Sequence, residues 1–320
     1  MKNLMNKKNL CWLILILASY ITISVLISAG VINNVAETIL MTIGINIILA
    51  ISLNLIIGVT GQFSLGHAGF MIIGAYAAGV AVKQISPDLM GIGIGMLIGM
   101  LISAVVALIV SIPTLRLRGD YLAIATLGFG EIIRIIILNM KITNGAAGLI
   151  LPKLVDWRMI FAAVVICTII ILNFGRSAQG RACISVREDE IAAEAMGVNT
   201  TRYKIMAFVL GAMIASIAGA LYAGAFYVIK PGMFTFNKSI DILVLVVFGG
   251  MGSFTGSFIS SAAIGILNAS LQQFADIRMI IYGLMLVVIM IFRPSGLLGT
   301  KEFSFTAIFD RFDKRKEGNV

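Results

Sequence analysis

The sequence is poor in charged residues, which make up 12% of its 320 positions, whereas 59% of the positions are hydrophobic. Soluble domains carry about 25% charged residues, and the mean hydropathy of this chain is +1.04. This composition excludes an ordinary soluble domain and indicates an integral membrane protein. The apolar runs are unbroken over about 17–25 residues, which favours spanning helices over the short alternating strands of a membrane β-barrel.

Residues that commonly carry catalysis or bind metals are also scarce. The chain has one histidine, His67, and three cysteines, Cys11, Cys167 and Cys183, which lie far apart in the sequence. This spacing implies neither a disulfide framework nor a metal site. The sequence contains no nucleotide-binding G-x-x-x-x-G-K-[ST] motif, no H-E-x-x-H and no G-x-S-x-G. We therefore expect a chain without enzymatic activity and without a metal or cofactor of its own.

The hydrophobic runs predict an all-α fold, a polytopic bundle of about 8–10 transmembrane helices. The predicted windows are Leu10–Ile32, Thr38–Gly58, Leu65–Val82, Leu89–Ile112, Leu122–Met140, Met159–Phe174, Ile205–Ile229, Ile240–Gly250, Phe258–Ala269 and Ile277–Phe292. The eighth and ninth windows are short and could instead form one broken or re-entrant unit. The first window follows a basic start and could belong to a signal peptide, but its length favours a retained span.

The 24 Lys and Arg residues outnumber the 15 Asp and Glu residues, which gives a formal net charge of +9. If the N-terminus lies inside, most of the basic residues fall in inner loops, as the positive-inside rule requires. Lys230 and Lys238 are then expected in an outer loop. The basic excess is therefore explained by topology and does not indicate nucleic-acid binding. We expect cytoplasmic N- and C-termini, one transmembrane domain over residues 1–300 and a short charged cytoplasmic tail over residues 301–320.

The longest polar segment between apolar runs covers residues 175–204. Ser185 and Glu188 have the S-x-x-E spacing of a capping box, and Gly197 is a natural residue to end a helix in the left-handed conformation. This pattern predicts one helix over Val186–Met196. Its small apolar face consists of Ile191, Ala192, Ala195 and Met196. That face either packs on the spans of its own chain or inserts into a groove on a soluble partner.

A few polar residues fall inside predicted spans, where one charge costs about 2.5–3.5 kcal/mol at mid-span on insertion scales. Glu131 and Arg134 are three residues apart and share a helix face, so they form a structural ion pair or lie beside a translocation path. His67 is a structural group, part of a gate, or a proton-coupling residue. Asn46, Asn54 and Asn268 are expected to make interhelical hydrogen bonds. The candidate residues of a translocation path are Asn54, Ser64, Gly66, His67, Glu131 and Arg134.

Four separated motifs carry a family resemblance. They are GQFSLGHAGFMIIGAYAAG from Gly61, PTLRLRGDYLAIATLGFGEIIR from Pro113, GRACISVREDEIAAEAMGVNTTRYK from Gly180 and GGMGSFTG from Gly249. In this order they resemble the LivM-like permeases for branched-chain amino acids. The order E-A-M-G at Glu194–Gly197 is similar to the loop by which permeases of ABC importers dock their cytoplasmic ATPase. The stretch ITNGAAGL from Ile142 departs from the family's Gly-rich pattern, so no substrate role is assigned to it.

The resemblance implies a permease subunit of an ABC importer, in the bacterial cytoplasmic membrane, that translocates leucine, isoleucine and valine. It implies three kinds of partner: a second, related permease chain, two cytoplasmic ATP-binding subunits that carry ATP and Mg²⁺, and an extracytoplasmic substrate-binding protein. We call residues 175–204 the coupling loop. Its implied coupling residues are Ser185, Glu188, Glu190, Ile191, Glu194, Ala195, Met196 and Gly197.

Other functions stay open at this point. A related permease could carry urea, short amides or a sugar. An ion-coupled secondary transporter for amino acids would need carboxylates or unwound ion sites inside the membrane, and Glu131 already has Arg134 beside it. A membrane enzyme or scaffold is disfavoured because His, Asp and Glu are so rare in the spans.

Overall fold

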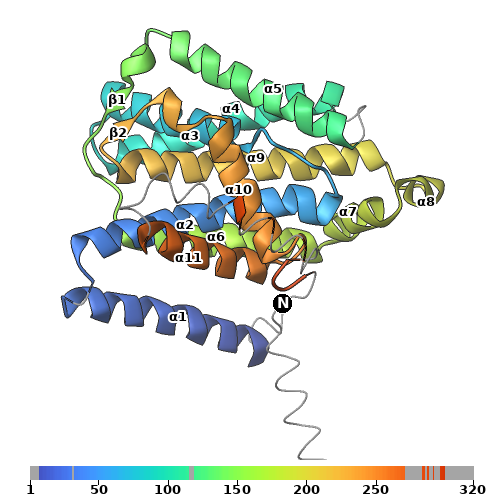
Figure 1. The fold of residues 1–320 in the computed structure, drawn as a ribbon, viewed down its shortest axis with the longest axis horizontal. Coiled ribbons are helices and arrows are strands. Elements are labelled where there is room, and N and C mark those ends of the chain that lie inside the picture. Colours follow the sequence, from blue (N-terminus) through green and yellow to red (C-terminus); the bar gives the residue numbers. More distant parts are fainter. Residues whose placement is uncertain are drawn as a thin grey trace, which may run out of the picture.

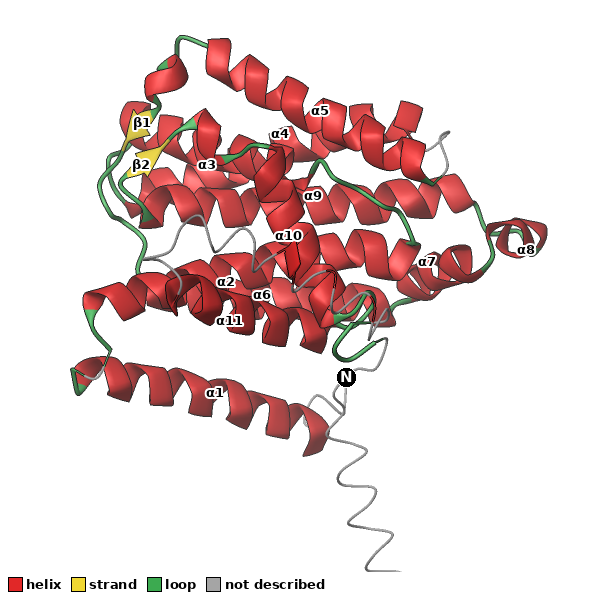
Figure 2. Cartoon of the chain, viewed as in Figure 1, coloured by secondary structure: helices red, strands yellow, loops and turns green. Residues whose placement is uncertain are grey.

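The computed structural model describes residues 7–30, 32–114, 119–270, 283–284, 287, 291 and 296–299. Long helices dominate these residues (Figures 1 and 2). In chain order the α-helices are α1 (Lys7–Ser28), α2 (Asn34–Asn54), α3 (His67–Gln84), α4 (Leu89–Thr114), α5 (Asp120–Asn139), α6 (Trp157–Arg176), α7 (Ala178–Glu188), α8 (Glu190–Ala195), α9 (Thr200–Ala225), α10 (Phe236–Gly249) and α11 (Phe254–Ser270).

Five short elements complete the fold of the described residues. A π-helix, η1 (Leu55–Val59), continues α2, and two 3₁₀ turns are η2 (Gly145–Ala147) and η3 (Pro231–Met233). Two strands, β1 (Leu149–Ile150) and β2 (Val228–Ile229), pair antiparallel. They tie the segment before α6 to the end of α9.

Six of the described helices are long and apolar enough to cross a membrane. They are Asn34–Val59, Leu89–Thr114, Tyr121–Asn139, Trp157–Arg176, Thr200–Ala225 and Pro231–Gly249. Every predicted window before Ile277 coincides with a helix, whereas the last window and the predicted tail over residues 301–320 lie largely or wholly outside the described residues. The prediction of a polytopic helical bundle is confirmed, and the protein is a multi-pass membrane protein.

The buried core forms where α2, α3, α4 and α9 pack side by side (Figure 1). Small residues allow this close packing. A Cβ atom at Gly74 of α3, for example, would overlap the backbone carbonyl of Ser216 on α9. The span of α2 and η1 is 67% buried and that of α9 is 61% buried, against 28% for α4 and 22% for α6. The helices therefore divide into two largely buried spans, α2 with η1 and α9, and peripheral spans such as α4 and α6, which bury one face and expose the other.

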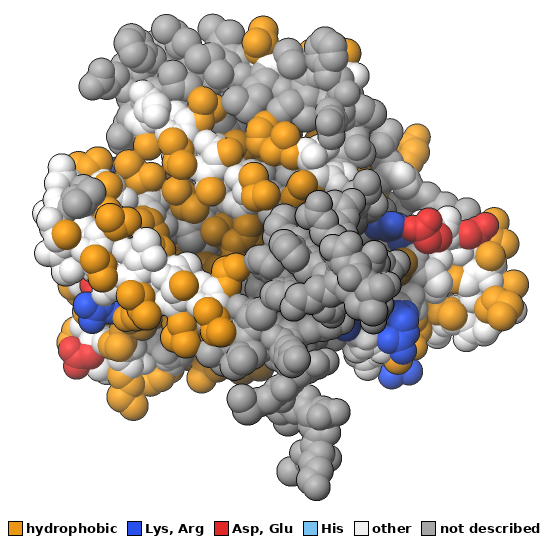
Figure 3. Space-filling model, turned by 90° about the horizontal axis from the view of Figure 1, so that it is seen from below, with side chains coloured by type: hydrophobic (Ala, Val, Ile, Leu, Met, Phe, Trp, Pro, Cys, Tyr) orange, Lys and Arg blue, Asp and Glu red, His pale blue; other side chains and the backbone are white. Residues whose placement is uncertain are grey.

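The peripheral helices turn apolar side chains outward. On α4 the exposed residues Leu97, Leu101, Val105 and Ile109 follow helical spacing. On the face seen in Figure 3, hydrophobic side chains cover a broad band, and charged side chains lie toward the two ends of the molecule. A wide apolar band between charged ends is what a bilayer requires of a spanning protein.

Helix α10 is one part of the span Pro231–Gly249, and its own 14 residues extend about 21 Å, which is less than the thickness of about 30 Å of hydrocarbon. It begins inside the bundle, where Lys238 Nζ donates to Asn46 Oδ1 at 3.4 Å, and Asn46 lies halfway along the span Asn34–Val59. The prediction that Lys238 lies in an outer loop is therefore wrong. The polar residues before Ile240 masked the true start of the helix.

Helices α10 and α11 pack against each other across the turn at residues 250–253. They form a helical hairpin, which agrees with the alternative of one broken unit for the eighth and ninth windows. The start of α1 and the helices α7 and α8 lie toward the same end of the bundle (Figure 1).

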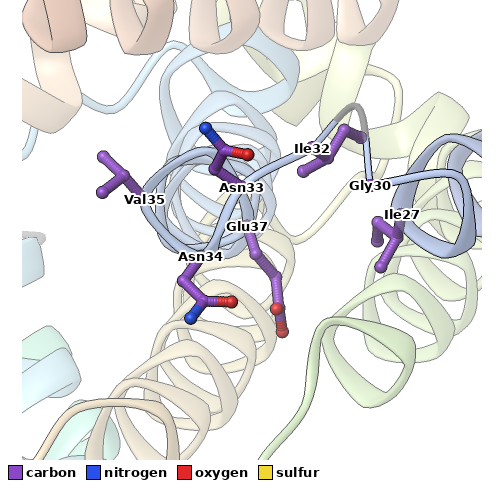
Figure 4. Close-up of a pocket in the computed structure, with 7 residues that line it drawn as sticks. All are labelled: Ile27, Gly30, Ile32, Asn33, Asn34, Val35 and Glu37. Atoms are coloured by element: carbon purple, nitrogen blue, oxygen red, sulfur yellow. The ribbon is translucent and has the colours of Figure 1, made fainter.

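A hollow of about 560 Å³ lies at the other end, where α1 turns into α2. Its lining includes Ile27, Asn34 and Glu37, and Figure 4 shows these side chains pointing in different directions rather than toward a common centre. Glu37 instead pairs with Lys153 at 3.7 Å. We therefore regard this hollow as the open edge of the α1–α2 turn and not as a binding site.

Candidate functional site

Three segments that are distant in the sequence meet inside the bundle. The backbone N–H of Leu65, just before α3, donates to Thr126 Oγ1 of α5 at 3.1 Å. The N–H of Ala68, in the first turn of α3, donates to Ser239 Oγ of α10 at 3.2 Å. We call this meeting point of the start of α3, the middle of α5 and the start of α10 the crossing. It lies at the depth where α10 begins, well inside the apolar band.

The crossing contains the Glu131–Arg134 pair. Arg134 Nε donates to Glu131 Oε2 at 2.7 Å, so the predicted pairing is confirmed. Glu131 Oε1 also accepts a hydrogen bond from the N–H of Phe236, the first residue of α10, at 3.1 Å. Thr235, which precedes α10, makes no side-chain cap. The Glu131 carboxylate therefore caps α10 from another helix, where the dipole of α10 favours negative charge.

Glycines bring α3 and α5 into contact at the crossing. A Cβ atom at Gly66 would overlap the backbone carbonyl of Thr126, and Gly130 packs on the backbone of Gly66. The cleft that remains beside Glu131 and Ser239 measures about 10 Å³, which is room for about one water molecule. An amino acid does not fit this cleft in the arrangement seen here.

His67 is fully buried and contacts α2. Its Nε2 atom lies 2.7 Å from Ser52 Oγ of α2. Among the described residues, neither His67 Nδ1 nor the buried Ser64 Oγ has a hydrogen-bond partner. Buried polar atoms without partners are uncommon and call for an explanation, so Ser64 and His67 remain candidates for a path.

Asn54 is placed at the end of α2, against the hairpin turn. Its Nδ2 donates to the carbonyl of Ser253 at 2.8 Å and to Ser257 Oγ at 2.9 Å, and its Oδ1 accepts from Gly252 N–H at 2.8 Å. The interhelical hydrogen bonds expected of Asn54 are thus present. Because both ends of the amide are engaged, Asn54 joins α2 to the α10–α11 hairpin.

Sequence reasoning missed two charged residues in α10. Lys238 is half-buried in the first turn, and Asp241 lies one turn further on, close enough to act electrostatically on the Lys238 ammonium. Charged side chains at such depth are costly and usually functional. The signal that could have found them is the run NKSID before the valines and leucines of α10, because a helix start carries no apolar signature of its own.

The coupling loop folds as two helices, not as one. Ser177 Oγ caps α7 by accepting from Gly180 N–H at 3.1 Å, and the helix ends where Asp189 turns extended, with φ −155° and ψ 110°. The predicted capping box of Ser185 and Glu188 is therefore wrong. Ser185 lies inside α7, where its hydroxyl donates to the carbonyl of Ala182 at 2.8 Å.

Asp189 is the residue that starts α8. Its Oδ1 accepts from the N–H groups of Ile191 and Ala192 at 2.9 and 3.0 Å, which is the bonding of an N-cap. The helix ends at Ala195 and is followed by Gly197, whose φ is +84°, with Val198 N–H donating to the carbonyl of Ala193 at 3.0 Å. The prediction of a left-handed residue at Gly197 is confirmed.

The apolar face of α8 is not buried on its own chain. Ile191 is 74% exposed and Met196 is 84% exposed, and α8 projects from the end of the bundle (Figure 1). Its tether to the bundle is Glu190, whose Oε1 accepts from Lys204 Nζ of α9 at 2.5 Å, together with the buried Ala193. An exposed apolar face on a projecting helix is typical of a docking element.

The chemistry available at these sites is limited. Within the part of the chain that the structure describes, no three His, Cys, Asp or Glu side chains gather in a way that could hold a metal ion. Burial raises the pKa of Cys183 in α7 to about 11, which leaves its thiol protonated and unreactive near neutral pH.

The comparison with protein families decides what this arrangement belongs to. A family model described as branched-chain amino acid transport system / permease component matches residues 35–290. The chain belongs to this family. The match includes the crossing and the whole coupling loop. None of the solved structures matches the chain.

Curated relatives give the same picture. High-affinity branched-chain amino acid transport system permease protein LivM of Salmonella typhimurium is 33% identical over 274 residues, which cover 74% of this chain and 64% of that protein. LivM of Escherichia coli is 32% identical over the same length and coverage. LivH of Escherichia coli is 30% identical over 161 residues, 50% of this chain and 51% of its own length. The chain thus spans 64% of the length of these LivM proteins.

Proposed function

We propose that this chain is the membrane-spanning permease subunit of an ABC importer that moves branched-chain amino acids across a bacterial cytoplasmic membrane. The observation that carries the proposal is the family match over residues 35–290. The names of the LivM and LivH relatives point to the cargo. The sequence has no nucleotide-binding motif, so partner subunits would supply ATP hydrolysis.

The coupling loop would dock the ATPase. Ile191 and Met196 stand exposed on α8, and acidic Glu194 lies between them. A groove on an ATP-binding subunit would take this apolar face in the helix-in-groove manner. With the loop inside, both termini would lie in the cytoplasm. The complex would contain a second, related permease chain, two ATP-binding subunits and an extracytoplasmic binding protein that delivers the cargo.

The crossing would be the point that the cargo passes. An apolar amino acid needs an apolar conduit with a few polar groups for its two charged ends. Ser64, His67, Glu131 and Arg134 supply such groups, and Lys238 adds a cation at the same depth. Since the cleft here is about 10 Å³, the helices would have to separate at the crossing during transport, as alternation between two global states requires.

Uptake by reconstituted complex tests the proposal. The complex would be purified by a tag on this chain, placed in liposomes with ATP inside and binding protein outside, and assayed with radiolabelled leucine. We expect ATP-dependent leucine uptake that isoleucine and valine inhibit and that urea and ribose leave unchanged. ATPase subunits that co-purify without leucine uptake would disprove the cargo alone. Uptake that ignores ATP and collapses with an uncoupler would instead establish an ion-coupled transporter.

A further inference from the structure

One side chain of the coupling loop reaches the bundle at the end of α2. Arg187, in the last turn of α7, donates through Nη1 to the backbone carbonyl of Gly58 at 2.5 Å. Its Nη2 holds Glu188 Oε1 at 2.5 Å. Within the described ranges, no other side chain of α7 or α8 hydrogen-bonds to α2 or η1. The guanidinium thus connects the loop to one carbonyl group of the membrane domain.

That carbonyl belongs to a special part of α2. Gly58 lies in η1, where the helix changes from α to π geometry before it ends. Single π-helical turns inside α-helices occur frequently at functional sites. The last carbonyls of a helix have no partner within the helix and carry its negative dipole end. Arg187 therefore satisfies an orphan carbonyl and places a positive charge where the helix dipole favours it.

The π-helical turn is also held from its other side. A Cβ atom at Gly58 would overlap Asn54 Oδ1 and the backbone N–H of Gly252, and Asn54 itself binds Gly252 and Ser253. The end of α2 is thus clamped between Arg187 and the α10–α11 hairpin turn. Neither contact leaves free space. A displacement of α7 would therefore move the π-helical turn and, through it, the α10–α11 hairpin turn.

From η1 the chain runs directly to the crossing. Gly61 is left-handed, with φ +69°, and packs against the Arg187 side chain. The connection then passes Gly66, which contacts Thr126, and enters α3 at His67. At the other end, α7 joins α8 through the single extended residue Asp189. Arg187 therefore stands between the exposed docking helix and the segment that builds the crossing.

We propose that Arg187 is a positioning residue that transmits movement of the docked α8 to the π-helical end of α2 and the 61–66 connection. The proposal rests on the proposed function, since it assumes that an ATPase subunit moves α8. Loss of the guanidinium would leave docking intact, because α8 keeps its cap, its tether to Lys204 and its exposed face. It would uncouple ATP hydrolysis from rearrangement at the crossing.

The test uses the assembled complex in nanodiscs and liposomes with three variants. Arg187→Gln removes the charge-assisted bond to Gly58, and Arg187→Lys keeps a charge but loses the fork that holds both Gly58 and Glu188. Arg181→Gln is the matched control, because Arg181 lies on the same helix and its one hydrogen bond to a described residue is local, to the carbonyl of Arg176. The readouts are co-purified ATPase subunits, leucine taken up per ATP hydrolysed, and hydrogen exchange of the 58–67 peptide with and without ATP and vanadate.

We expect Arg187→Gln to retain the ATPase subunits while uptake per ATP falls about tenfold. The nucleotide-dependent change in exchange of the 58–67 peptide should disappear, Arg187→Lys should restore part of it, and Arg181→Gln should match the wild type. A purely structural role would alter exchange equally with and without nucleotide. If Arg187→Gln prevents assembly, the nucleotide-dependent change in hydrogen exchange is compared between Arg187→Lys and the wild type, and this comparison tests the proposal.

Several outcomes overturn the proposal. An unchanged nucleotide response in Arg187→Gln, or in Arg187→Lys where Gln does not assemble, excludes Arg187 as the link. Arg187 is also excluded as the link if hydrogen exchange of the 58–67 peptide in the wild-type complex does not change with nucleotide. If ATPase subunits are present but leucine is not taken up, only the assigned cargo is disproved, because the hydrogen-exchange measurement requires no cargo. ATPase subunits absent from the wild-type complex would overturn this inference and the proposed function together.

Discussion

The crossing and the coupling loop are built in opposite ways. The crossing joins residues near positions 66, 131 and 238 through single long-range hydrogen bonds, of which the one between Ala68 and Ser239 is buried and the one between Phe236 and Glu131 is exposed. The coupling loop is contiguous in sequence, is largely exposed and is organised by caps within a few residues. The difference teaches that changes at the crossing should cost stability and assembly first, whereas changes on α8 should cost partner binding and leave the fold intact.

Glu131→Ala should have the largest effect on this contrast. It would leave Arg134 without its carboxylate and the N-terminus of α10 without its cap, at a cost of about 3 kcal/mol in unfolding free energy. Denaturant unfolding of the purified complex measures the loss. The double variant Glu131→Ala/Arg134→Leu should recover part of it, since no unpaired charge remains. If Glu131→Ala is as stable as the wild type, the Glu131–Arg134 pair contributes nothing to the unfolding free energy.

Gly66→Ala should come next. The added Cβ would overlap the Thr126 carbonyl, so α3 and α5 would have to separate, at a cost of about 2 kcal/mol. Gly128→Ala is the matched control, because a Cβ at Gly128 meets nothing within 4 Å. Thermal unfolding of the two variants should differ clearly. Equal midpoints would argue against close packing of these helices.

Ile191→Ser tests the other half of the comparison. The variant should fold normally, since Ile191 is 74% exposed, but should bind the ATPase subunits about tenfold more weakly, which is about 1.4 kcal/mol. Ile150→Ser removes an equally exposed isoleucine, 77%, from β1 at the opposite end. Affinity for added ATPase subunits should be normal in that control. Equal affinities for both variants would remove α8 as the docking element.

Asp189→Ala should have the smallest effect. It removes the N-cap of α8, which is worth about 1 kcal/mol, and should loosen the coupling loop without changing the membrane domain. Limited proteolysis between Glu188 and Gly197 would become faster. The Ser185→Ala variant should be cleaved at the wild-type rate, because among the described residues the Ser185 side chain bonds within α7 alone. Faster cleavage of Ser185→Ala instead would restore the capping box expected from the sequence.

The sequence predicted what depends on composition and near neighbours. The hydrophobic windows located the helices, and the spacing of Glu131 and Arg134 predicted their ion pair. Gly197 revealed the end of α8, because a left-handed residue has a local signature. The start of α8 was misplaced because Ser185 and Asp189 are both good caps, and only the fold selects between them. Lys238 and Arg187 were missed because their partners, Asn46 and Gly58, lie far away in the sequence.

The π-helical turn at Leu55–Val59 has a consequence for insertions and deletions. A π turn bonds each residue to the fifth one along instead of the fourth, so it stores one residue more than an α-helix needs. Removing one residue there would take away the surplus, so the helix would become α-helical throughout and the positions beyond the turn would keep their orientation. The same deletion within Asn34–Asn54 meets no surplus, so it would turn the two parts of the helix by about 100° relative to each other. At Leu55–Val59 the chain therefore accommodates a change of length that it does not accommodate one turn earlier.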